Sequence, residues 1–532
     1  MLQKLFPKKR ILPIAVLSAV LTLLIVTGYE IDHFDSLSFR PITAVATAGT
    51  FVICSFVLAA LYCLMDRIHF SGNCTISRKK AFLISFLILI VLYIVFLLGV
   101  FPGLFNFDAQ AQYNRYRLNL ISEHHPVLHT VILGFLVTRF SESVTDIQKG
   151  VFVYSIVQVF LSAMAFPYAV SYVYSKLKNK IALYGMILFF GIYPPIVLQV
   201  LSATKDSYFL IFFMISVTMV LEFFDDEKTF VSRIWKPVIL TLSVVLMTIF
   251  RNNCMYAVPV LWILILVKSK KETRKYAAVM TGAFLGLFVL YKVLFVPAFV
   301  TEKVNGKEFY SVPIQQIMRV YTSDDSVISD SQREIVEKLF AEEGREYYPA
   351  IADVPKAYID MDYYKSHKKE VQQMYLDVIR QNPKDGAEAF LAVNCGMWYP
   401  GCDLTLYPEG IKGYWPIECL EPARLEPVIP MIQDFFTGFE EKYFSTQKVI
   451  FPYLFAPGSF FVLFLAMLLY ATEKKKKGFV VAGIFVFVYW LTFLLGPVAL
   501  VRYAMFLYVM LPFYLLLPVG NKETVEENKE TE

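Results

Sequence analysis

Charged residues are scarce in this sequence of 532 residues. Asp, Glu, Lys and Arg make up 18% of it, whereas hydrophobic residues make up 57% and aromatic residues 16%. A water-soluble domain cannot hide so much apolar surface, but a lipid bilayer can cover it. The composition therefore excludes an ordinary soluble protein. No cluster of basic residues with interleaved aromatics occurs, so we expect no nucleic-acid partner.

Other common features are also lacking. The first apolar run (11–26) follows Lys8, Lys9 and Arg10 but has no small-x-small cleavage site after it, so we expect a retained membrane anchor and not a signal peptide. No internal repeat stands out. The seven cysteines have no zinc-ribbon spacing, which excludes that class of metal module.

Long apolar stretches are abundant, and the sequence predicts an all-α polytopic membrane protein with about twelve transmembrane helices. The predicted spans are 11–28, 42–65, 81–101, 150–174, 181–200, 207–224, 237–250, 254–267, 276–298, 449–470, 479–496 and 503–519. A further apolar segment, 127–140, has about 14 residues, which is too few for a span. We predict that it forms a juxtamembrane helix in the outer interface.

Basic residues gather in alternate gaps between these spans. With the amino terminus inside, every dense basic cluster falls on the cytoplasmic side, as the positive-inside rule requires. The clusters comprise Arg67, Arg78, Lys79 and Lys80; Lys176, Lys178 and Lys180; Lys228, Arg233 and Lys236; Lys268, Lys270, Lys271, Arg274 and Lys275; and 474–477. The agreement holds only if 127–140 does not cross.

This topology places a set of polar and charged residues outside, most of them at the outer ends of spans. They are Asp108, His124, His125, Lys205, Asp206, Arg251 and Arg502. Arg251 and Arg502 are cations on the side that the rule usually depletes, and a planar guanidinium suits a phosphate group. The sequence therefore predicts an outer-leaflet site for a lipid phosphate.

The same topology divides the chain into four parts. They are an N-terminal transmembrane module, 1–298, with catalytic outer loops 102–149 and 200–206; an extracytoplasmic domain, 299–448; C-terminal transmembrane helices, 449–520; and a disordered cytoplasmic tail, 521–532. We call the extracytoplasmic domain the insert. Apolar residues at helical spacing predict amphipathic helices over 331–343 and 364–381, and a further helix begins within 385–394. No set of strands is evident.

Two features of the insert leave alternatives open. An aromatic cluster could stack on sugar rings, or it could form the core of the insert or an interfacial belt. Its members are Trp398, Tyr399, Tyr407, Tyr414 and Trp415. Cys395 and Cys402 would close a small loop as a disulfide, but pairing among Cys254, Cys395, Cys402 and Cys419 cannot be read from sequence.

Short motifs recur along almost the whole chain. They are Pro-Gly…Asp…Gln (102–110), His-Pro (125–126), Thr-Lys-Asp (204–206), Arg-Asn-Asn (251–253), Pro-Ile-Gln-Gln (313–316) and Trp-Tyr-Pro (398–400). With them the chain resembles an uncharacterised family of Gram-positive bacterial membrane proteins in the GT-C glycosyltransferase superfamily. That superfamily includes protein mannosyltransferases and the aminoarabinose transferase of lipid A. The insert is a departure, because better-known GT-C enzymes carry their soluble domain after the last span.

The resemblance implies roles for the acids. Asp108 would be the base that takes the acceptor proton, and Asp206 would support the acceptor, a metal or Lys205. The alternatives are that Asp108 caps a helix starting near Ala109 and that Lys205 and Asp206 form a local ion pair. A divalent cation (Mg²⁺ or Mn²⁺) held by Asp108 and Asp206 stays open, because GT-C enzymes differ in this requirement.

The remaining predicted site residues would bind substrate. Lys205, Arg251 and Arg502 would hold the phosphate, although snorkelling to lipid headgroups is an alternative for the two arginines. The other predicted contacts are Gln110, His124, His125, Asn252, Trp398 and Tyr399.

These inferences point to a glycosyltransferase in a bacterial plasma membrane, with an extracytoplasmic active site. Its expected partners are a polyprenyl-phosphate sugar lipid and a cell-surface glycan, lipid or protein acceptor. The alternatives are a polytopic transporter or flippase of lipid-linked glycans and a non-catalytic cell-envelope assembly factor. Few charges lie inside the predicted spans, which argues against transport.

Overall fold

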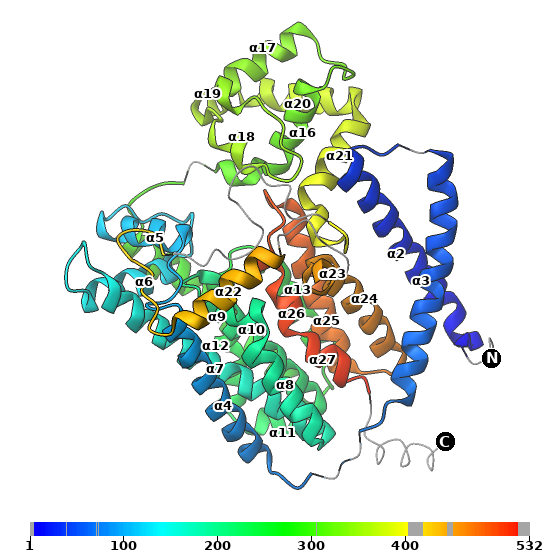
Figure 1. Ribbon diagram of the computed structural model, residues 1–532, viewed down its shortest axis with the longest axis vertical. Helices are drawn as coiled ribbons and strands as arrows, with labels where there is room; N and C mark the ends of the chain where they lie inside the picture. The colour runs from blue at the N-terminus through cyan, green and yellow to red at the C-terminus, as the bar shows by residue number, and fades with distance from the viewer. Residues whose placement is uncertain are drawn as a thin grey trace.

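Helices make up the regular structure of this protein (Figure 1). The computed structural model describes residues 5–38, 40–70, 72, 74–304, 306–402, 419–443 and 451–519. Within these ranges there is no β-strand, only isolated bridges. The predicted all-helical fold is therefore confirmed for the described residues.

Seven helices are long and apolar enough to cross a membrane, which supports the prediction of a membrane protein. They are α2 (Lys8–Phe34), α3 (Pro41–Arg67), α4 (Arg78–Gly99), α7 (Gln148–Leu177), α10 (Lys205–Asp225), the segment Arg274–Phe299 and the segment Lys477–Leu495. The segment Arg274–Phe299 comprises α14 (Arg274–Leu290), a π-helical turn (Tyr291–Phe295) and α15 (Val296–Phe299). The segment Lys477–Leu495 comprises α25 (Lys477–Leu491) and the 3₁₀ turn η5 (Thr492–Leu495).

The predicted count of twelve spans is not confirmed. A broken pair, α8 (Lys180–Ile192) and α9 (Pro194–Leu201), is bent by 55° and could form an eighth span. The other four predicted spans contain shorter apolar helices. They are α12 (Trp235–Phe250), α13 (Cys254–Lys268), α24 (Pro457–Glu473) and the pair α26 (Val501–Val509) and α27 (Leu511–Leu516). Proline contributes to this shortening, because α24 and α27 each have a proline in their first turn.

The bundle is built around α10. Of the seven candidate spans it is the most buried, with 83% of its most apolar window inside the protein, against 17% for α3. It packs against α7, α12, α25 and α26. Figure 1 shows α2 and α3 as a hairpin at one side of this bundle. Most side chains of α10 are therefore enclosed by other helices.

The insert has its own small core. The core joins α16 (Ser311–Thr322), α17 (Asp330–Leu339), α19 (Met361–Ser366) and α20 (Lys368–Gln381), next to the short helix α18 (Asp353–Ala357). Ser329 and Gln332 form a capping box that starts α17. The helix predicted over 364–381 is divided in two at His367. The third predicted helix is α21 (Pro383–Asn394), followed by the 3₁₀ turn η4 (Cys395–Met397).

Short helices complete the described chain. They are α5 (Phe107–Arg117), α6 (Val127–Phe140), α11 (Glu227–Ser232), α22 (Pro430–Tyr443), α23 (Phe451–Phe455) and the 3₁₀ turns Lys307–Tyr310 and Glu342–Gly344. The helix α6 coincides with the segment predicted to be too short to cross. The predicted tail, 521–532, lies outside the described residues.

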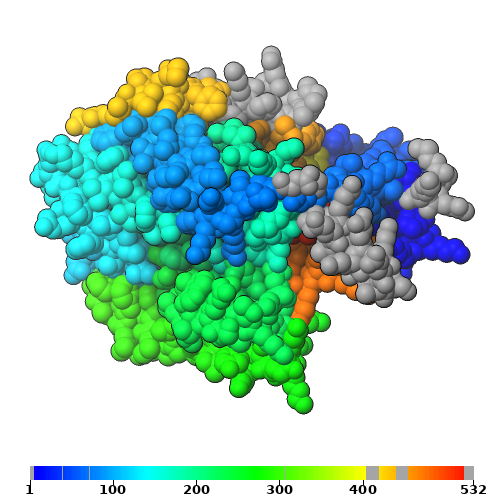
Figure 2. All heavy atoms as spheres, turned by 90° about the horizontal axis from the view of Figure 1, so that it is seen from below, coloured from blue at the N-terminus to red at the C-terminus, as the bar shows by residue number. Residues whose placement is uncertain are grey.

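The basic segments between the predicted spans meet at one end of the bundle. Glu222, near the C-terminal end of α10, binds Arg78 and also Lys236, whose Nζ lies 2.6 Å from Oε2. Nearby, Asp225 at the end of α10 binds Lys176 at 2.6 Å, and Glu227 at the start of α11 binds Lys477 at 3.0 Å. Figure 2 looks onto the end of the molecule opposite the insert, where the segments around α4 (blue) and α11–α14 (green) lie next to each other.

Candidate functional site

Charged side chains converge at the N-terminal end of α10, where three segments that are far apart in the sequence meet. Oδ2 of Asp108 accepts hydrogen bonds from Nζ of Lys205 at 2.9 Å and from Nη1 of Arg502 at 3.0 Å. Nζ of Lys205 also lies 3.4 Å from Nδ1 of His125. The structure therefore brings together four of the residues predicted for the site.

Backbone pairing places Asp108 beside Lys205. Leu104 N donates to Leu201 O at 3.0 Å, and Ala203 N donates to Leu104 O at 2.9 Å, so the segment before α5 runs along the segment before α10. Gly103 permits this course with a φ of +121°, and a Cβ there would lie 2.1 Å from Oγ of Ser155.

Asn106, and not Asp108, caps α5. Its side chain accepts a hydrogen bond from Ala109 N at 3.4 Å, and α5 begins at Phe107. The alternative that Asp108 is the helix cap is therefore wrong. Its carboxylate is left to face the two cations.

A second ion pair lies next to the first. Nη1 of Arg251 donates to Oδ1 of Asp206, and both side chains are buried. The guanidinium of Arg251 lies 4.7 Å from the ring centre of Tyr503, and that of Arg502 lies 5.2 Å from the same ring. Tyr503 therefore bridges the two ion pairs. We call Asp108, Lys205, Arg502, Asp206 and Arg251 the charged cluster.

The charged cluster contains polar atoms with unused hydrogen-bonding capacity. Within the described part of the chain, Oδ2 of Asp206 and Nε of Arg502 are buried and have no hydrogen-bond partner. Buried polar atoms of this kind are rare in proteins and often mark the place of water or a ligand. A polar ligand that enters the cluster could satisfy both atoms.

The electrostatics of the cluster favour an ionised Asp108. Burial alone would raise the pKa of Asp108, but the charges of Arg502 and Lys205 outweigh it and hold the pKa well below its ordinary value. Burial, reinforced by Lys205, lowers the pKa of His125 well below its ordinary value. His125 is therefore neutral at neutral pH and can accept a hydrogen bond from the Lys205 ammonium.

A buried hydrogen-bond network that the sequence did not reveal supports α5. Gln112 donates to the backbone oxygen of Asp108 at 3.1 Å, and Oε1 of Gln112 lies 2.7 Å from Nδ1 of His129. Nε2 of His129 lies 2.7 Å from the hydroxyl of Tyr154. The spacing of Asp108 and Gln112, four residues apart on one helix, is the only sequence signal of this support.

Several predicted site residues lie elsewhere. Gln110 donates to the backbone oxygen of Glu421. His124 is partly exposed and lies 3.7 Å from Glu308. Asn252 is exposed in the turn between α12 and α13.

Trp398 and Tyr399 belong to the protein interior. Nε1 of Trp398 donates to Oδ1 of Asn394 at 2.6 Å, and the ring of Tyr399 packs against Gly28 of α2. Both side chains are buried, so they cannot stack on a sugar. They belong to the main core of the helix bundle and not to the core of the insert. The remaining members of the predicted aromatic cluster, Tyr407, Tyr414 and Trp415, lie outside the described residues.

The predicted covalent and metal features differ from the structure. All seven cysteines are among the described residues and none forms a disulfide, so the predicted bridge between Cys395 and Cys402 is absent. The carboxylates of Asp108 and Asp206 bind Lys205, Arg502 and Arg251. Three cations around two carboxylates do not suit a Mg²⁺ or Mn²⁺ ion.

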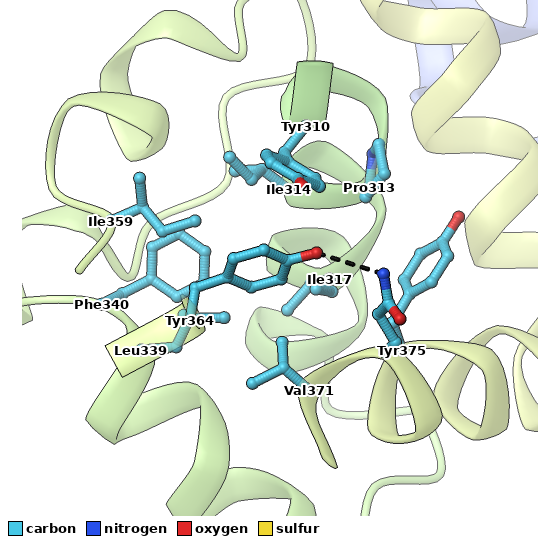
Figure 3. A pocket seen from close by; sticks show the side chains of 11 residues that line it. Tyr310, Pro313, Ile314, Ile317, Leu339, Phe340, Ile359, Tyr364, Val371 and Tyr375 are labelled. Carbon is cyan, nitrogen blue, oxygen red and sulfur yellow. Dashed lines mark hydrogen bonds between the residues drawn. The ribbon is translucent and has the colours of Figure 1, made fainter. Parts of the chain in front are cut away.

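A separate cavity lies inside the insert (Figure 3). Its walls are aliphatic and aromatic, and Nε2 of Gln372 donates to the hydroxyl of Tyr364 at 3.2 Å across it. The lining residues are Tyr310, Pro313, Ile314, Ile317, Leu339, Phe340, Ile359, Tyr364, Val371, Gln372 and Tyr375. None of the predicted site residues is among them, and such a wall does not suit a charged phosphate.

Comparison with known proteins gives one family. A family of unknown function (DUF6020) matches residues 116–530, a range that contains every member of the charged cluster except Asp108. No curated protein and no solved structure matches the chain. Because the match covers most of the sequence, the chain belongs to the family of unknown function DUF6020.

Proposed function

We propose that this chain is a membrane glycosyltransferase of the GT-C type that transfers a sugar from a polyprenyl-phosphate donor to a cell-surface acceptor. The observation that carries the proposal is the charged cluster, in which three cations surround the buried carboxylate of Asp206 and the partly buried carboxylate of Asp108. Such a cluster has both of the groups that the transfer needs: a carboxylate to accept a proton and cations to stabilise a departing phosphate.

The position of the cluster supports an active site at the outer face. Asp206 stands in the first turn of α10, whereas Glu222, which binds Arg78 and Lys236, stands in its last. Positively charged gaps face the cytoplasm in most membrane proteins. The end of α10 with Arg78 and Lys236 would then be cytoplasmic, and the charged cluster would lie at the outer surface of a bacterial plasma membrane.

In the proposed reaction the acceptor hydroxyl gives its proton to Asp108, and its oxygen forms a bond to the anomeric carbon of the sugar. The bond from that carbon to the phosphate oxygen breaks, and its electron pair leaves with the polyprenyl phosphate. Arg502, Lys205 and Arg251 stabilise the negative charge on the leaving phosphate.

The donor itself would activate Asp108. In the ligand-free cluster Arg502 and Lys205 hold the pKa of Asp108 too low for an efficient base. A donor phosphate that draws these two cations toward itself weakens their effect on the carboxylate, and burial then raises the pKa of Asp108. Proton transfer therefore follows donor binding.

One observation favours a second candidate, a transporter of lipid-linked glycans. The pair α8 and α9 is bent by 55°, and broken spans of this kind line the binding sites of many transporters. Transporter sites lie near the middle of the bilayer, whereas the charged cluster lies at one end of α10. This position favours the transferase. A non-catalytic assembly factor, the third alternative, would tolerate loss of the Asp108 carboxylate.

Asp108→Asn tests the proposal, because it removes the proton acceptor and preserves the shape of the side chain. We expect sugar transfer to fall by a factor on the order of 10² to 10⁴. Lipid and wall-glycan profiles are compared among strains with the deletion, the wild type and the variant at equal protein levels. The matched control is Glu142→Gln, an exposed carboxylate of the same outer loop that pairs with Lys149.

The outcomes separate the candidates. If Asp108→Asn restores the wild-type profile to a strain that the deletion alters, Asp108 is not the base. Detergent-solubilised membranes, incubated with the lipid-linked sugars of the same strain, distinguish transfer from transport. Donor consumption that depends on Asp108 supports a transferase, because detergent leaves no compartments between which a transporter could act.

A further inference from the structure

Two cysteines of the insert and one aspartate of α2 converge at a place apart from the charged cluster. A carboxylate oxygen of Asp32 and the sulfur atoms of Cys395 and Cys402 all lie within 4.8 Å of one another. Asp32 stands near the end of α2, and Cys395 opens the 3₁₀ turn η4. We call these three residues the Asp–Cys cluster.

Two successive turns bring the cysteines together. Tyr399 N donates to Cys395 O at 2.9 Å, and Cys402 N donates to Tyr399 O at 3.3 Å. Gly28, one helical turn before Asp32, allows the ring of Tyr399 to dock on α2, because a Cβ there would lie 2.3 Å from the ring. The fold therefore holds the segment from Cys395 to Cys402 against the part of α2 that carries Asp32.

The three side chains are suited to bind zinc. Thiolate and carboxylate are common zinc ligands, with bonds of about 2.3 Å to sulfur and about 2.0–2.2 Å to oxygen. Ligand atoms around one tetrahedral ion are then roughly 3.3–3.8 Å apart. Separations below 4.8 Å reach that geometry through small side-chain rotations.

The surroundings resemble those of a metal site in two further respects. The side chain of Asp32 is only 5% exposed and Cys395 is 3% exposed, so bulk water has little access to these two donors. Cys402 is partly buried. Nδ1 of His33 lies 3.5 Å from Oδ2 of Asp32, which is the position of an outer partner that orients a ligating carboxylate.

A metal accounts for all three donors, whereas a disulfide accounts for two. A bridge between Cys395 and Cys402 would join the two sulfurs and leave the Asp32 carboxylate outside the bond. A divalent cation binds both thiolates and the carboxylate together. Mixed sulfur and oxygen donors suit Zn²⁺ better than Mg²⁺ or Ca²⁺, which prefer oxygen alone.

We propose that Asp32, Cys395 and Cys402 bind one Zn²⁺ ion, with water as the fourth ligand. The ion would fasten the chain that follows α21 to the first transmembrane hairpin. This proposal does not depend on the transferase activity.

Metal analysis of the full-length protein in detergent, purified without chelator or reductant, tests it. We expect about one zinc per chain, either as purified or after Zn²⁺ is added and excess is removed. Asp32→Asn, Cys395→Ser and Cys402→Ser should each lose the zinc. Cys419→Ser should retain it, because Cys419 lies outside the Asp–Cys cluster and contacts the backbone oxygen of Gly103. A wild-type protein that binds no zinc overturns the proposal, and so does zinc that persists in all three variants.

Thiol alkylation of the wild type needs no substitution and so avoids a folding defect. We expect the partly buried Cys402 to resist alkylation until a chelator removes the metal. Protection that only a reductant removes indicates a disulfide and overturns the zinc site. Alkylation without either treatment, or protection that neither treatment removes, also contradicts it.

Discussion

At the scale of single residues, the charged cluster depends on partners that neutralise one another. Asp108 is bound by a lysine from α10 and an arginine from α26, and Asp206 by an arginine that follows α12. Removing one partner of a buried pair leaves an uncompensated charge, which typically costs about 3–5 kcal/mol. Replacing Asp by Asn keeps the shape of the side chain but also removes its charge, so variants at these positions are compared at equal protein levels.

His125 should make the stability of the protein depend on pH. Its folded-state pKa is well below the ordinary value, which is about 6.5 in an unfolded chain. As the pH falls below about 6.5, the unfolded state binds a proton that the folded state does not, so stability present above this pH is lost. The loss continues until the pH reaches the depressed folded-state pKa, at up to roughly 1.4 kcal/mol per pH unit.

His125→Gln removes the imidazole that binds this proton in the unfolded chain. We expect the drop in Tm between about pH 7.5 and about pH 5.5 to be smaller in the variant than in the wild type. Thermal unfolding of the detergent-solubilised protein at several pH values measures it. His367→Gln, an exposed histidine of the insert, serves as the control and should keep the wild-type slope. Equal slopes for wild type and His125→Gln would contradict the burial argument.

At the scale of helices, the sequence predicts where apolar segments lie better than how long they are. Helices occur in all twelve predicted spans, because runs of apolar residues are visible without any tertiary information. Their ends are set locally, by Pro457 at the start of α24 and Pro512 at the start of α27. A hydropathy window averages over such breaks, so it does not show which apolar segments form a single helix long enough to cross a membrane.

The candidate site was predictable only in part, for a related reason. The types and positions of Asp108, Lys205 and Arg502 indicate ion-binding chemistry at span ends, but nothing local indicates that Asp108 and Arg502, 394 positions apart, touch. Single-residue ambiguities also need the structure. Asn106 and Asp108 are both good helix caps, and only the backbone geometry shows that Asn106 is used.

Gly103 controls the element that carries Asp108. Its φ of +121° strains any other residue, and a Cβ would collide with Ser155. We expect Gly103→Ala to lower the free energy of unfolding by about 1–3 kcal/mol and to reduce sugar transfer, because the pairing of Leu104 with 201–203 shifts. Thermal unfolding and donor consumption measure the two effects.

Two variants isolate the cause of that loss. Gly49→Ala lies in α3 with open space around it, so it should leave stability unchanged or raise it by up to about 1 kcal/mol. Gly103→Ala combined with Ser155→Ala removes the 2.1 Å contact with Oγ but keeps the 3.0 Å contact with Cβ of residue 155 and the backbone strain, so it should recover only part of the loss. Full recovery would show that the positive φ has no energetic role.

At the scale of the whole molecule, ionic contacts separate the bundle into two chemically different ends. At one end Glu222, Asp225 and Glu227 bind lysines from the segments between spans, and the other end holds the charged cluster. The insert stands beyond the second end in Figure 1.

The insert is held to the first hairpin through Arg319 of α16. Its Nη1 lies 2.8 Å from Oδ1 of Asp35 and 3.0 Å from the hydroxyl of Tyr347, and its Nη2 lies 2.7 Å from Oε2 of Glu388. Glu388 is 1% exposed, and Arg319 is its closest cation, because the exposed Lys384 lies farther away, at 3.6 Å. Because the insert has its own core, loss of the contact should loosen the junction and leave the insert folded.

Arg319→Gln tests this arrangement. We expect the junction to lose about 3 kcal/mol or more, because the buried Glu388 keeps its charge and loses its strongest partner. Hydrogen exchange should become faster in α21 and at the end of α2, and stay slow around Val336 and Val378 in the insert core. Arg380→Gln, which removes an exposed arginine 3.8 Å from Asp377, should leave exchange unchanged throughout. If Arg319→Gln instead accelerates exchange evenly across the insert, the insert core depends on the junction and does not fold as a separate unit.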